Sequence, residues 1–421
     1  MSFVGMVLAT QAWGMEVETG LPPLKTNDWN FILVPSFEGS AVEGSNNLSV
    51  QGLNHALRFA QVLDGAVAGK ESAIKGLYAL TPKTAPQDLA PLESIEPFAV
   101  LNNRAVTVSS LTMKTPTAWD GTEGFLQGIV GDSPKGTYVF SGGEGMITAM
   151  AQGLGAKLDK IPEGADYLVA SGNGGHFTLT AYDDGLTAVN TYPEPVLPPP
   201  MASCAMEKAV TFSVDPPKGF SPQPNQTVYM VRHVEAHPTP AFEDGNYVCQ
   251  GQWRALGVAD RLLEVLGGRA PDYVYGPNPA SINRCQEGAC SYIRATMTVA
   301  PFAIKTGLPL TLAAFDWNNG TDLAESLFNP ASPYFQWSKT EPQTILVGWE
   351  HDHIVKAAQY VIADLYQNPA AAKDLPPWAF NDYDSIWKLE TDANGVLTFS
   401  NSCELIDSAS LPTTCPAFFP K

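Results

Sequence analysis

Four of the six histidines of this 421-residue chain lie in two short segments of its second half. His233 and His237 follow the apolar residues 228–231, and His351 and His353 follow residues 344–349. Both apolar runs are short and β-prone, and the sequence turns polar where each run ends, so both are predicted strands. Imidazole at a strand end can serve as a nucleophile or as a metal ligand. If the two strands are neighbours in an α/β sheet, their carboxyl ends open into one crevice.

Three motifs of this half resemble those of the histidine phosphatase superfamily, which has the phosphoglycerate mutase-like fold. Residues 232–235, Arg-His-Val-Glu, resemble the Arg-His motif at the end of the family's first strand. Residues 291–298 resemble its Ser-x-x-Arg motif with a following Thr, and residues 345–351 resemble its later strand with a second catalytic His. The resemblance covers about residues 226–370. The order and the domain-scale spacing of the motifs make it specific.

The resemblance implies a role for each matching residue. His233 is expected to attack phosphorus and carry the phosphoryl group as phosphohistidine. Arg232 and Arg294 would bind the equatorial oxygens, and His351 would donate to the same oxygens. Asp352, directly after His351, resembles the His-Asp arrangement of the acid phosphatase branch, which implies a general acid.

Other branches of the family take the acid from a loop in the middle of the domain. Here that loop offers Asp316, Asp322 and Glu325 as alternatives to Asp352. Glu235 is interpreted as structural, orienting the loop around the nucleophile.

The sequence departs from the family pattern at several positions. Val234 replaces the common Gly after the nucleophile, and Trp349 and Glu350 replace small residues, so they are expected to narrow the pocket or to add a carboxylate. Residues 276–290 resemble an insertion. We interpret Arg284, inside it, as solvated rather than as a substrate contact.

The chain also shows signs of an internal repeat. Four pairs of segments match in order: 31–34 with 229–231, 51–57 with 250–256, 97–99 with 301–303, and 136–147 with 343–354. The Pro-rich residues 191–226 separate the two halves and allow little continuous helix or central strand. We therefore predict a tandem duplication: an N-terminal extension (1–26), a degenerate copy (27–190), a connector (191–226) and a catalytic copy with a C-terminal extension (227–421).

Each half alternates predicted strands and helices. This pattern predicts two α/β domains of the phosphoglycerate mutase-like, three-layer α/β/α type, each a mostly parallel sheet with helices on both faces. In the first half, the four phosphate-handling positions carry Pro35, Ser36, Ala90 and Glu144. Without guanidinium or imidazole groups, this half is expected to reject phosphate and instead to pack against, regulate or shape the other half.

Composition narrows the function classes further. The formal net charge of −19 argues against nucleic acid as a partner, and no apolar stretch approaches the roughly 20 residues of a membrane-spanning helix. Residues 1–14 are apolar but lack Lys and Arg, so they match a signal peptide only weakly and leave the compartment open. His55 and His176 match no motif and are interpreted as ordinary histidines.

The six cysteines contain no C-x-x-C pair, which argues against zinc ribbons and thioredoxin chemistry. Cys403 with Cys415, and Cys285 with Cys290, are close enough in sequence to form disulfides. Six buried thiols fit the sequence equally well.

The sequence thus predicts a metal-independent hydrolase without a cofactor, acting on a small phosphorylated metabolite. A non-catalytic phosphate-binding or scaffolding protein and a phosphomutase remain alternatives. A metal site at His233-x-x-x-His237 is disfavoured, because Pro238 opposes the helix that would join the two rings, and Arg232 and Arg294 would repel a cation. Specificity is expected from the loops at 237–249, 276–290 and 316–340; oligomeric state is not predicted.

Overall fold

The computed structural model describes residues 15–20, 22–67, 74–83, 88–115, 118–204, 208–237, 243–286 and 288–417. Residues 1–14, considered above as a signal peptide, lie outside the described residues. Among the described residues, no helix has the length and apolar character needed to cross a membrane.

The first half of the described chain forms a sheet of eight strands. They are β1 (Val17–Thr19), β2 (Trp29–Pro35), β3 (Ile74–Pro82), β4 (Thr107–Thr115), β5 (Ala118–Asp120), β6 (Gly136–Gly142), β7 (Tyr167–Gly172) and β8 (Phe177–Asp183). Their order is β1-β8-β7-β2-β6-β3-β4-β5, with β2, β6, β3 and β4 parallel to one another. Residues 31–34 of β2 are an unbroken apolar run with no exposed surface, as expected for a parallel strand covered on both faces.

The second half forms a sheet of seven described strands. They are β9 (Thr211–Val214), β10 (Gln226–Arg232), β11 (Tyr273–Gly276), β14 (Leu310–Leu312), β15 (Gln343–Trp349), β16 (Ser385–Thr391) and β17 (Leu397–Cys403). Their order is β14-β11-β15-β10-β16-β17-β9, in which the first four strands are parallel and the last three pair antiparallel. A separate hairpin joins β12 (Ile282–Cys285) and β13 (Gly288–Ser291).

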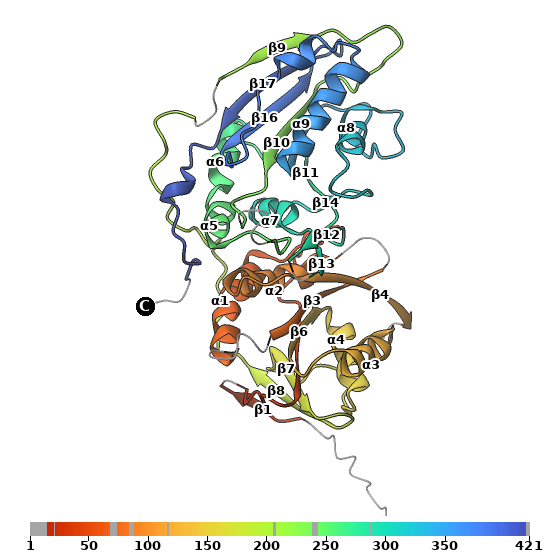
Figure 1. Ribbon diagram of the computed structural model, residues 1–421, viewed down its shortest axis with the longest axis vertical. Coiled ribbons are helices and arrows are strands. Elements are labelled where there is room, and N and C mark those ends of the chain that lie inside the picture. Colours follow the sequence, from red (N-terminus) through yellow and green to blue (C-terminus); the bar gives the residue numbers. More distant parts are fainter. Residues whose placement is uncertain are drawn as a thin grey trace, which may run out of the picture.

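Helices cover both faces of both sheets (Figure 1). They are α1 (Val50–Val67), α2 (Ala90–Leu101), α3 (Thr122–Asp132), α4 (Glu144–Gly153), α5 (Cys249–Gly257), α6 (Ala259–Val265), α7 (Arg294–Thr306), α8 (Gly320–Phe328) and α9 (His351–Tyr360), which continues into the π-helical Val361–Leu365. Helices α3 and α4 pack on the outer face of the first sheet, and α8 and α9 on the outer face of the second. The remaining five helices share one apolar core between the sheets.

The predicted α/β class with helices on both faces is therefore confirmed. Each sheet is mixed, with parallel strands at its centre and antiparallel strands joined to them. Beyond β2 and β10 the parallel strands are extended by antiparallel ones, since the links from β7 to β8 and from β16 to β17 are short and return the chain as hairpins. In the first sheet, β5 also pairs antiparallel with β4 at the other side.

The two sheets share one strand order. The series β4-β3-β6-β2-β7-β8 in the first sheet has the same sequence order as β14-β11-β15-β10-β16-β17 in the second. Helices α2 and α7 each contain an internal proline, Pro97 and Pro301. The Pro-rich residues 191–226 contain β9, which lies at a sheet edge, and residues 1–26 contain β1, which pairs with β8.

Polar contacts join the two halves beside the shared core. The Asn46 side chain bonds both backbone groups of Leu310, with Nδ2 donating at 3.0 Å and Oδ1 accepting at 3.1 Å. The backbone N–H of Val108 donates to Oγ of Ser291 at 2.9 Å. Ser291 is the serine of the second motif, so the first half directly contacts a motif residue of the second.

All six cysteines form disulfides. The pairs are Cys204–Cys403, Cys249–Cys415 and Cys285–Cys290. The predicted Cys285–Cys290 pair is present, but the pair Cys403–Cys415 is wrong. After β17 the chain runs to α5, where Trp253 Nε1 donates to the carbonyl of Thr414 at 2.7 Å, so Cys415 reaches α5 rather than β17.

Candidate active site

Two neighbouring parallel strands bring the predicted residues to one edge of the second sheet. β10 ends at Arg232 and β15 at Trp349, which lie opposite each other in register. The backbone N–H of His233 donates to the carbonyl of Trp349 at 2.8 Å. The loops that follow open into a cleft of about 680 Å³. Its lining is Arg232, His233, Ala236, His237, Glu243, Asn283, Arg284, Cys285, Gln286, Arg294, Trp317, Glu350, His351, Asp352, His353, Phe380 and Tyr383.

His233 lies on the floor of this cleft with its protonation state fixed by a backbone group. Its Nδ1 lies 2.8 Å from the carbonyl oxygen of Val234. A carbonyl only accepts, so Nδ1 carries the proton and Nε2 keeps its lone pair. Burial, together with the nearby charges of Arg294 and Arg232, holds the pKa of His233 well below its usual value. The ring is therefore neutral and nucleophilic at physiological pH.

The loop that carries His233 is held from α7. The backbone N–H of Val234 donates to Oγ1 of Thr298 at 3.0 Å, and that hydroxyl donates to the carbonyl of Arg294 at 2.8 Å. The Thr of the second motif thus connects both motifs.

The two arginines of the motifs flank His233, and each already makes hydrogen bonds within the protein. Arg294, the first residue of α7, donates from Nη2 to a carboxylate oxygen of Glu243 at 2.8 Å. Arg232 donates from Nη1 to the carbonyls of Phe380 and, at 3.2 Å, Asp382. Its guanidinium carbon lies 4.2 Å from the centre of the Tyr383 ring. Burial lowers the pKa of Arg232, yet guanidinium remains charged at any physiological pH.

Glu350 orients the imidazoles that follow β15. As the N-cap of α9, it accepts from the backbone N–H of His353 at 3.1 Å. Its carboxylate oxygens lie 2.5 Å from Nδ1 of His351 and 2.6 Å from Nδ1 of His353. Burial favours the neutral acid, but the two histidines outweigh it and hold the pKa of Glu350 far below its usual value. Glu350 therefore places a carboxylate in the cleft, whereas Trp349 is fully buried and does not line it.

Asp352 is the predicted acid that reaches the cleft. Its Oδ1 lies 3.6 Å from Nε2 of His351, and its side chain is 69% exposed. The three alternatives do not line the cleft. Asp322 bonds Asn319 at the start of α8, Glu325 bonds Asn329 and Tyr360, and Asp316 lies in the loop between β14 and α8.

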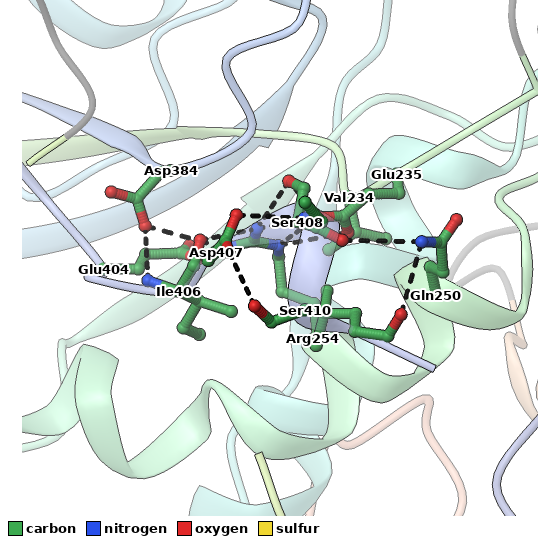
Figure 2. Close-up of polar contacts among 12 residues, drawn as sticks. Val234, Glu235, Gln250, Arg254, Asp384, Glu404, Ile406, Asp407, Ser408 and Ser410 are labelled. Carbon is green, nitrogen blue, oxygen red and sulfur yellow. Dashed lines mark hydrogen bonds and ion pairs between the residues drawn. The ribbon is translucent and has the colours of Figure 1, made fainter. Parts of the chain in front are cut away.

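Glu235 lies beside this site in a buried ionic cluster (Figure 2). Arg254 of α5, which has no exposed side-chain surface, donates from Nε and Nη2 to Glu235 at 2.7–3.1 Å. The same guanidinium donates to Glu404 at 2.8 Å and to Ser408 at 3.0 Å, and lies 3.7 Å from Asp384. This cluster ties the segment after His233 to α5 and to the C-terminal chain, in the structural role expected for Glu235.

The insertion at 276–290 forms one wall of the cleft. Its hairpin β12–β13 is closed by the disulfide Cys285–Cys290. Arg284 on this hairpin is exposed, as expected of a solvated residue, but it also lines the cleft. A second hollow of about 290 Å³ lies behind the hairpin, between the two halves.

The first half has a hollow of about 380 Å³ in the corresponding place. Its lining includes Pro35, Ser36 and Glu144, and it has no Lys or Arg among the described residues. His55, interpreted from sequence as an ordinary histidine, lies there between Glu38 at 3.2 Å and Asp184 at 2.8 Å. This hollow therefore lacks the guanidinium groups that the cleft of the second half contains.

The arrangement also bears on metal binding. Residues 233–237 form no helix, and His233 and His237 do not belong to any group of described residues close enough to share an ion. The groups with suitable spacing are Glu350, His351 and Asp352, and, in the first half, His55, Asp166 and Asp184.

Several lining residues were not predicted from the sequence. Glu243 and Trp317 fall in two of the loops expected to set specificity, but nothing in the sequence singles them out. Phe380 and Tyr383 come from the segment between α9 and β16, which carries no motif. Only the sheet order, which places β16 beside β10, brings this segment to the cleft.

Comparison with known proteins gives likeness to solved structures only. No family model and no curated protein matches the chain. SixA from Agrobacterium tumefaciens is 18% identical, with 40% of this chain and 92% of that one covered and a TM-score of 0.26. Phosphoglycerate mutase from Plasmodium falciparum is 16% identical (46% and 98% covered, TM-score 0.26), and a mycobacterial glucosyl-3-phosphoglycerate phosphatase is 13% identical (41% and 96% covered, TM-score 0.26). These identities and TM-scores are low.

Proposed function

We propose that this protein hydrolyses phosphomonoesters of small metabolites through a phosphohistidine at His233. The observation that carries the proposal is the state of the His233 ring. It is buried and neutral, it lies near two guanidinium groups, and its Nδ1 keeps its proton because that proton bonds the carbonyl of Val234. Such an imidazole is a competent nucleophile for phosphorus. The arginines supply the charge that a phosphoryl group needs.

The reaction proceeds in two balanced steps. Nε2 of His233 attacks phosphorus, the bond to the ester oxygen breaks, and the leaving oxygen takes a proton from the carboxylic acid of Asp352. Water then attacks the phosphohistidine and gives its proton to the Asp352 carboxylate, so that inorganic phosphate and the original His233 are released. Arg232, Arg294 and His351 bind the non-bridging oxygens in both steps.

We propose further that the chain is a tandem duplication, with a degenerate copy at 27–190 and a catalytic copy at 227–421. The shared strand order and the equivalent prolines of α2 and α7 support this. Residues 1–26 and 191–226 would be an extension and a connector. In this scheme the first half supports the second, for instance through the bond from Val108 to Ser291.

The test is hydrolysis of p-nitrophenyl phosphate with EDTA and, separately, with vanadate, together with alkaline-quench trapping of ³²P-labelled enzyme. Wild type should turn over in EDTA, be inhibited by vanadate and yield an acid-labile phosphoenzyme. His233→Ala should lose turnover by at least about 10³-fold and form no phosphoenzyme. Ser36→Ala, at the corresponding position of the first half, serves as the matched control and should match wild type. Unchanged turnover in His233→Ala would overturn the proposal.

One observation favours a second candidate, a phosphate-binding protein without turnover. The carboxylate of Glu243 already accepts a hydrogen bond from the Arg294 guanidinium. Phosphate binding without phosphoenzyme or turnover of any phosphomonoester would support that candidate. Transfer of the label to a second hydroxyl compound rather than to water would indicate a phosphomutase.

A further inference from the structure

The mouth of the cleft carries aromatic surface that the proposed chemistry does not use. We infer that the substrate has an aromatic ring on its alcohol side, and that this ring packs on Trp317 and Phe380. The inference deepens the proposed function and rests on it for the orientation of the substrate. It names a substrate class: arylalkyl and aryl phosphomonoesters.

Exposure orders the cleft from floor to mouth. Arg232, His233 and Arg294 are at most 7% exposed and form the floor. Phe380 is 59% exposed, and the Asp352 side chain 69%. A phosphoryl group that reaches Nε2 of His233 must lie on the floor, so the ester oxygen and everything beyond it lie toward the mouth. This places the alcohol side of the substrate next to the exposed ring.

Trp317 is held rigidly where it lines the cleft. Its ring stacks on Tyr292 with centroids 4.1 Å apart and planes 16° apart, and its Nε1 donates to the carbonyl of Ile282 at 3.3 Å. The ring of His353 meets it nearly edge-on at 5.5 Å. Tyr292 covers one face, and the indole remains partly exposed. A fixed indole loses little conformational freedom on binding, so its open surface is a preformed platform.

Phe380 offers a second apolar surface on the loop that holds Arg232. Its carbonyl accepts from Arg232, and its ring lies 5.6 Å from that guanidinium and 6.0 Å from the ring of His351. An exposed phenyl ring at the edge of a polar site gains from covering by another apolar group. A flat ring fits best, because aromatic pairs gain electrostatic contact beyond the area they bury.

One wall of the cleft, formed by the hairpin β12–β13, is polar and offers the ring no apolar surface. Asn283, Arg284 and Gln286 of the hairpin line that wall. The hydroxyl groups of a sugar phosphate could bond these polar side chains, and its ring could pack on the indole of Trp317. A sugar phosphate is therefore the main competing substrate. The large exposure of Phe380, which offers no hydrogen bond, favours the aromatic ring.

The experiment compares substrates that differ only in the ring. 2-Phenylethyl phosphate and 2-cyclohexylethyl phosphate have leaving groups of nearly equal acidity and similar size. We expect kcat/KM to favour the phenyl compound by at least about fivefold. In Trp317→Leu and in Phe380→Leu this ratio should fall toward one. Phe125→Leu, which changes a ring of the first half that packs on Tyr78, is the control and should keep the wild-type ratio.

Binding provides a second readout that needs no turnover. The affinities of 3-phenylpropylphosphonate and 3-cyclohexylpropylphosphonate, measured by calorimetry, should differ in the same direction and lose that difference in both variants. A ratio near one in wild type, a ratio unchanged by both substitutions, or glucose 6-phosphate turned over faster than the phenyl compound would each overturn the inference. If the protein binds the phenyl phosphonate more tightly than the cyclohexyl one but turns over no phosphomonoester, the inferred ring site stands and the proposed hydrolysis is wrong.

Discussion

The carboxylate of Glu243 lies 2.8 Å from Nη2 of Arg294, so a group of the protein's own occupies one of the two guanidinium groups expected to bind phosphate. Both side chains are largely buried, 13% and 9% exposed. Charge-assisted hydrogen bonds of this kind contribute about 1.5–3 kcal/mol. A phosphoryl group bound by the remaining N–H groups of Arg294 would lie beside this negative charge, which opposes anion binding in the resting site.

Glu243→Gln should tighten anion binding. Removing the negative charge frees Arg294 and removes repulsion, so we expect Ki for inorganic phosphate and for vanadate to fall by about tenfold. The measurement is competitive inhibition at several phosphate concentrations. Glu264→Gln, which breaks an exposed ion pair with Arg261 outside the cleft, should leave Ki unchanged. A higher Ki in Glu243→Gln would mean that Glu243 positions Arg294 for binding rather than competing for it.

The pKa values of two histidines should be shifted in opposite directions from the usual value. Burial and the nearby Arg294 and Arg232 hold the pKa of His233 well below 6.5, so this ring should remain neutral down to mildly acidic pH. Burial also acts against protonation of His55, but Asp184 and Glu38 outweigh it and raise its pKa to about 9. NMR titration of the imidazole Cε1–H signals, assigned with His233→Ala and His55→Gln, should show one ring neutral and one charged at pH 7. A midpoint near 6.5 for His233 would contradict the assigned environment.

Arg254 should be required for both stability and turnover. Three carboxylates, Glu235, Asp384 and Glu404, surround its guanidinium (Figure 2), so Arg254→Met would leave them without a counter-charge. Loss of one partner of a buried ion pair costs about 3–5 kcal/mol. Urea unfolding should show a loss of this size. Turnover of the folded fraction should also fall, because Glu235 is two residues from the nucleophile.

Lys114→Met provides the control for this change, since its side chain is largely exposed and pairs with the exposed Asp120 away from the cluster. It should cost less than about 1 kcal/mol. Equal losses in the two variants would mean that the cluster around Arg254 does not stabilise the fold. Arg254→Lys, which keeps the charge but loses the forked geometry, should be intermediate.

Local patterns were sufficient to predict the α/β class and the strand-end positions of His233 and His351. The unbroken apolar runs of β10 and β15 indicate buried parallel strands, and abrupt polarity at their ends indicates a site. The antiparallel edge of each sheet was not predicted, because parallel and antiparallel pairing depends on the path of the connections. The path of the chain also explains why the disulfide of Cys415 was not predicted, since its partner Cys249 is 166 residues away.

The rest of the cleft depends on contacts between distant segments. Glu243 reaches Arg294 across 51 residues, and Phe380 reaches Arg232 across 148. Neither contact leaves a periodic or motif signal in the sequence. Arg284, interpreted from the sequence as solvated, reaches the wall of the cleft because the closed hairpin carries it there.

The interface between the halves should make stability depend on pH. Burial raises the pKa of Glu93 and of Glu96 on α2 to about 8, although the backbone N–H of Leu48 and the hydroxyl of Tyr247 respectively favour their ionised forms. In the unfolded chain both carboxyls ionise near pH 4.5, so the folded protein binds more protons between about pH 4.5 and 8. Stability should therefore be greatest at the acidic side of this range and fall as pH rises toward 8.

Urea unfolding at pH 6.5, 7.25 and 8.0 measures this effect. Each carboxyl contributes a slope of up to about 1.4 kcal/mol per pH unit, with stability lost on going to higher pH. The lowered pKa of His233 opposes this slope mainly below pH 6.5, and the raised pKa of His55 adds to it. Both contributions are the same in wild type and variant, so the difference between their slopes is the contribution of the two carboxyls. Glu93→Gln with Glu96→Gln should flatten the slope, whereas Glu123→Gln with Glu163→Gln, two exposed sites, should not. An unchanged slope in the first pair would mean that both acids are ionised in the folded protein.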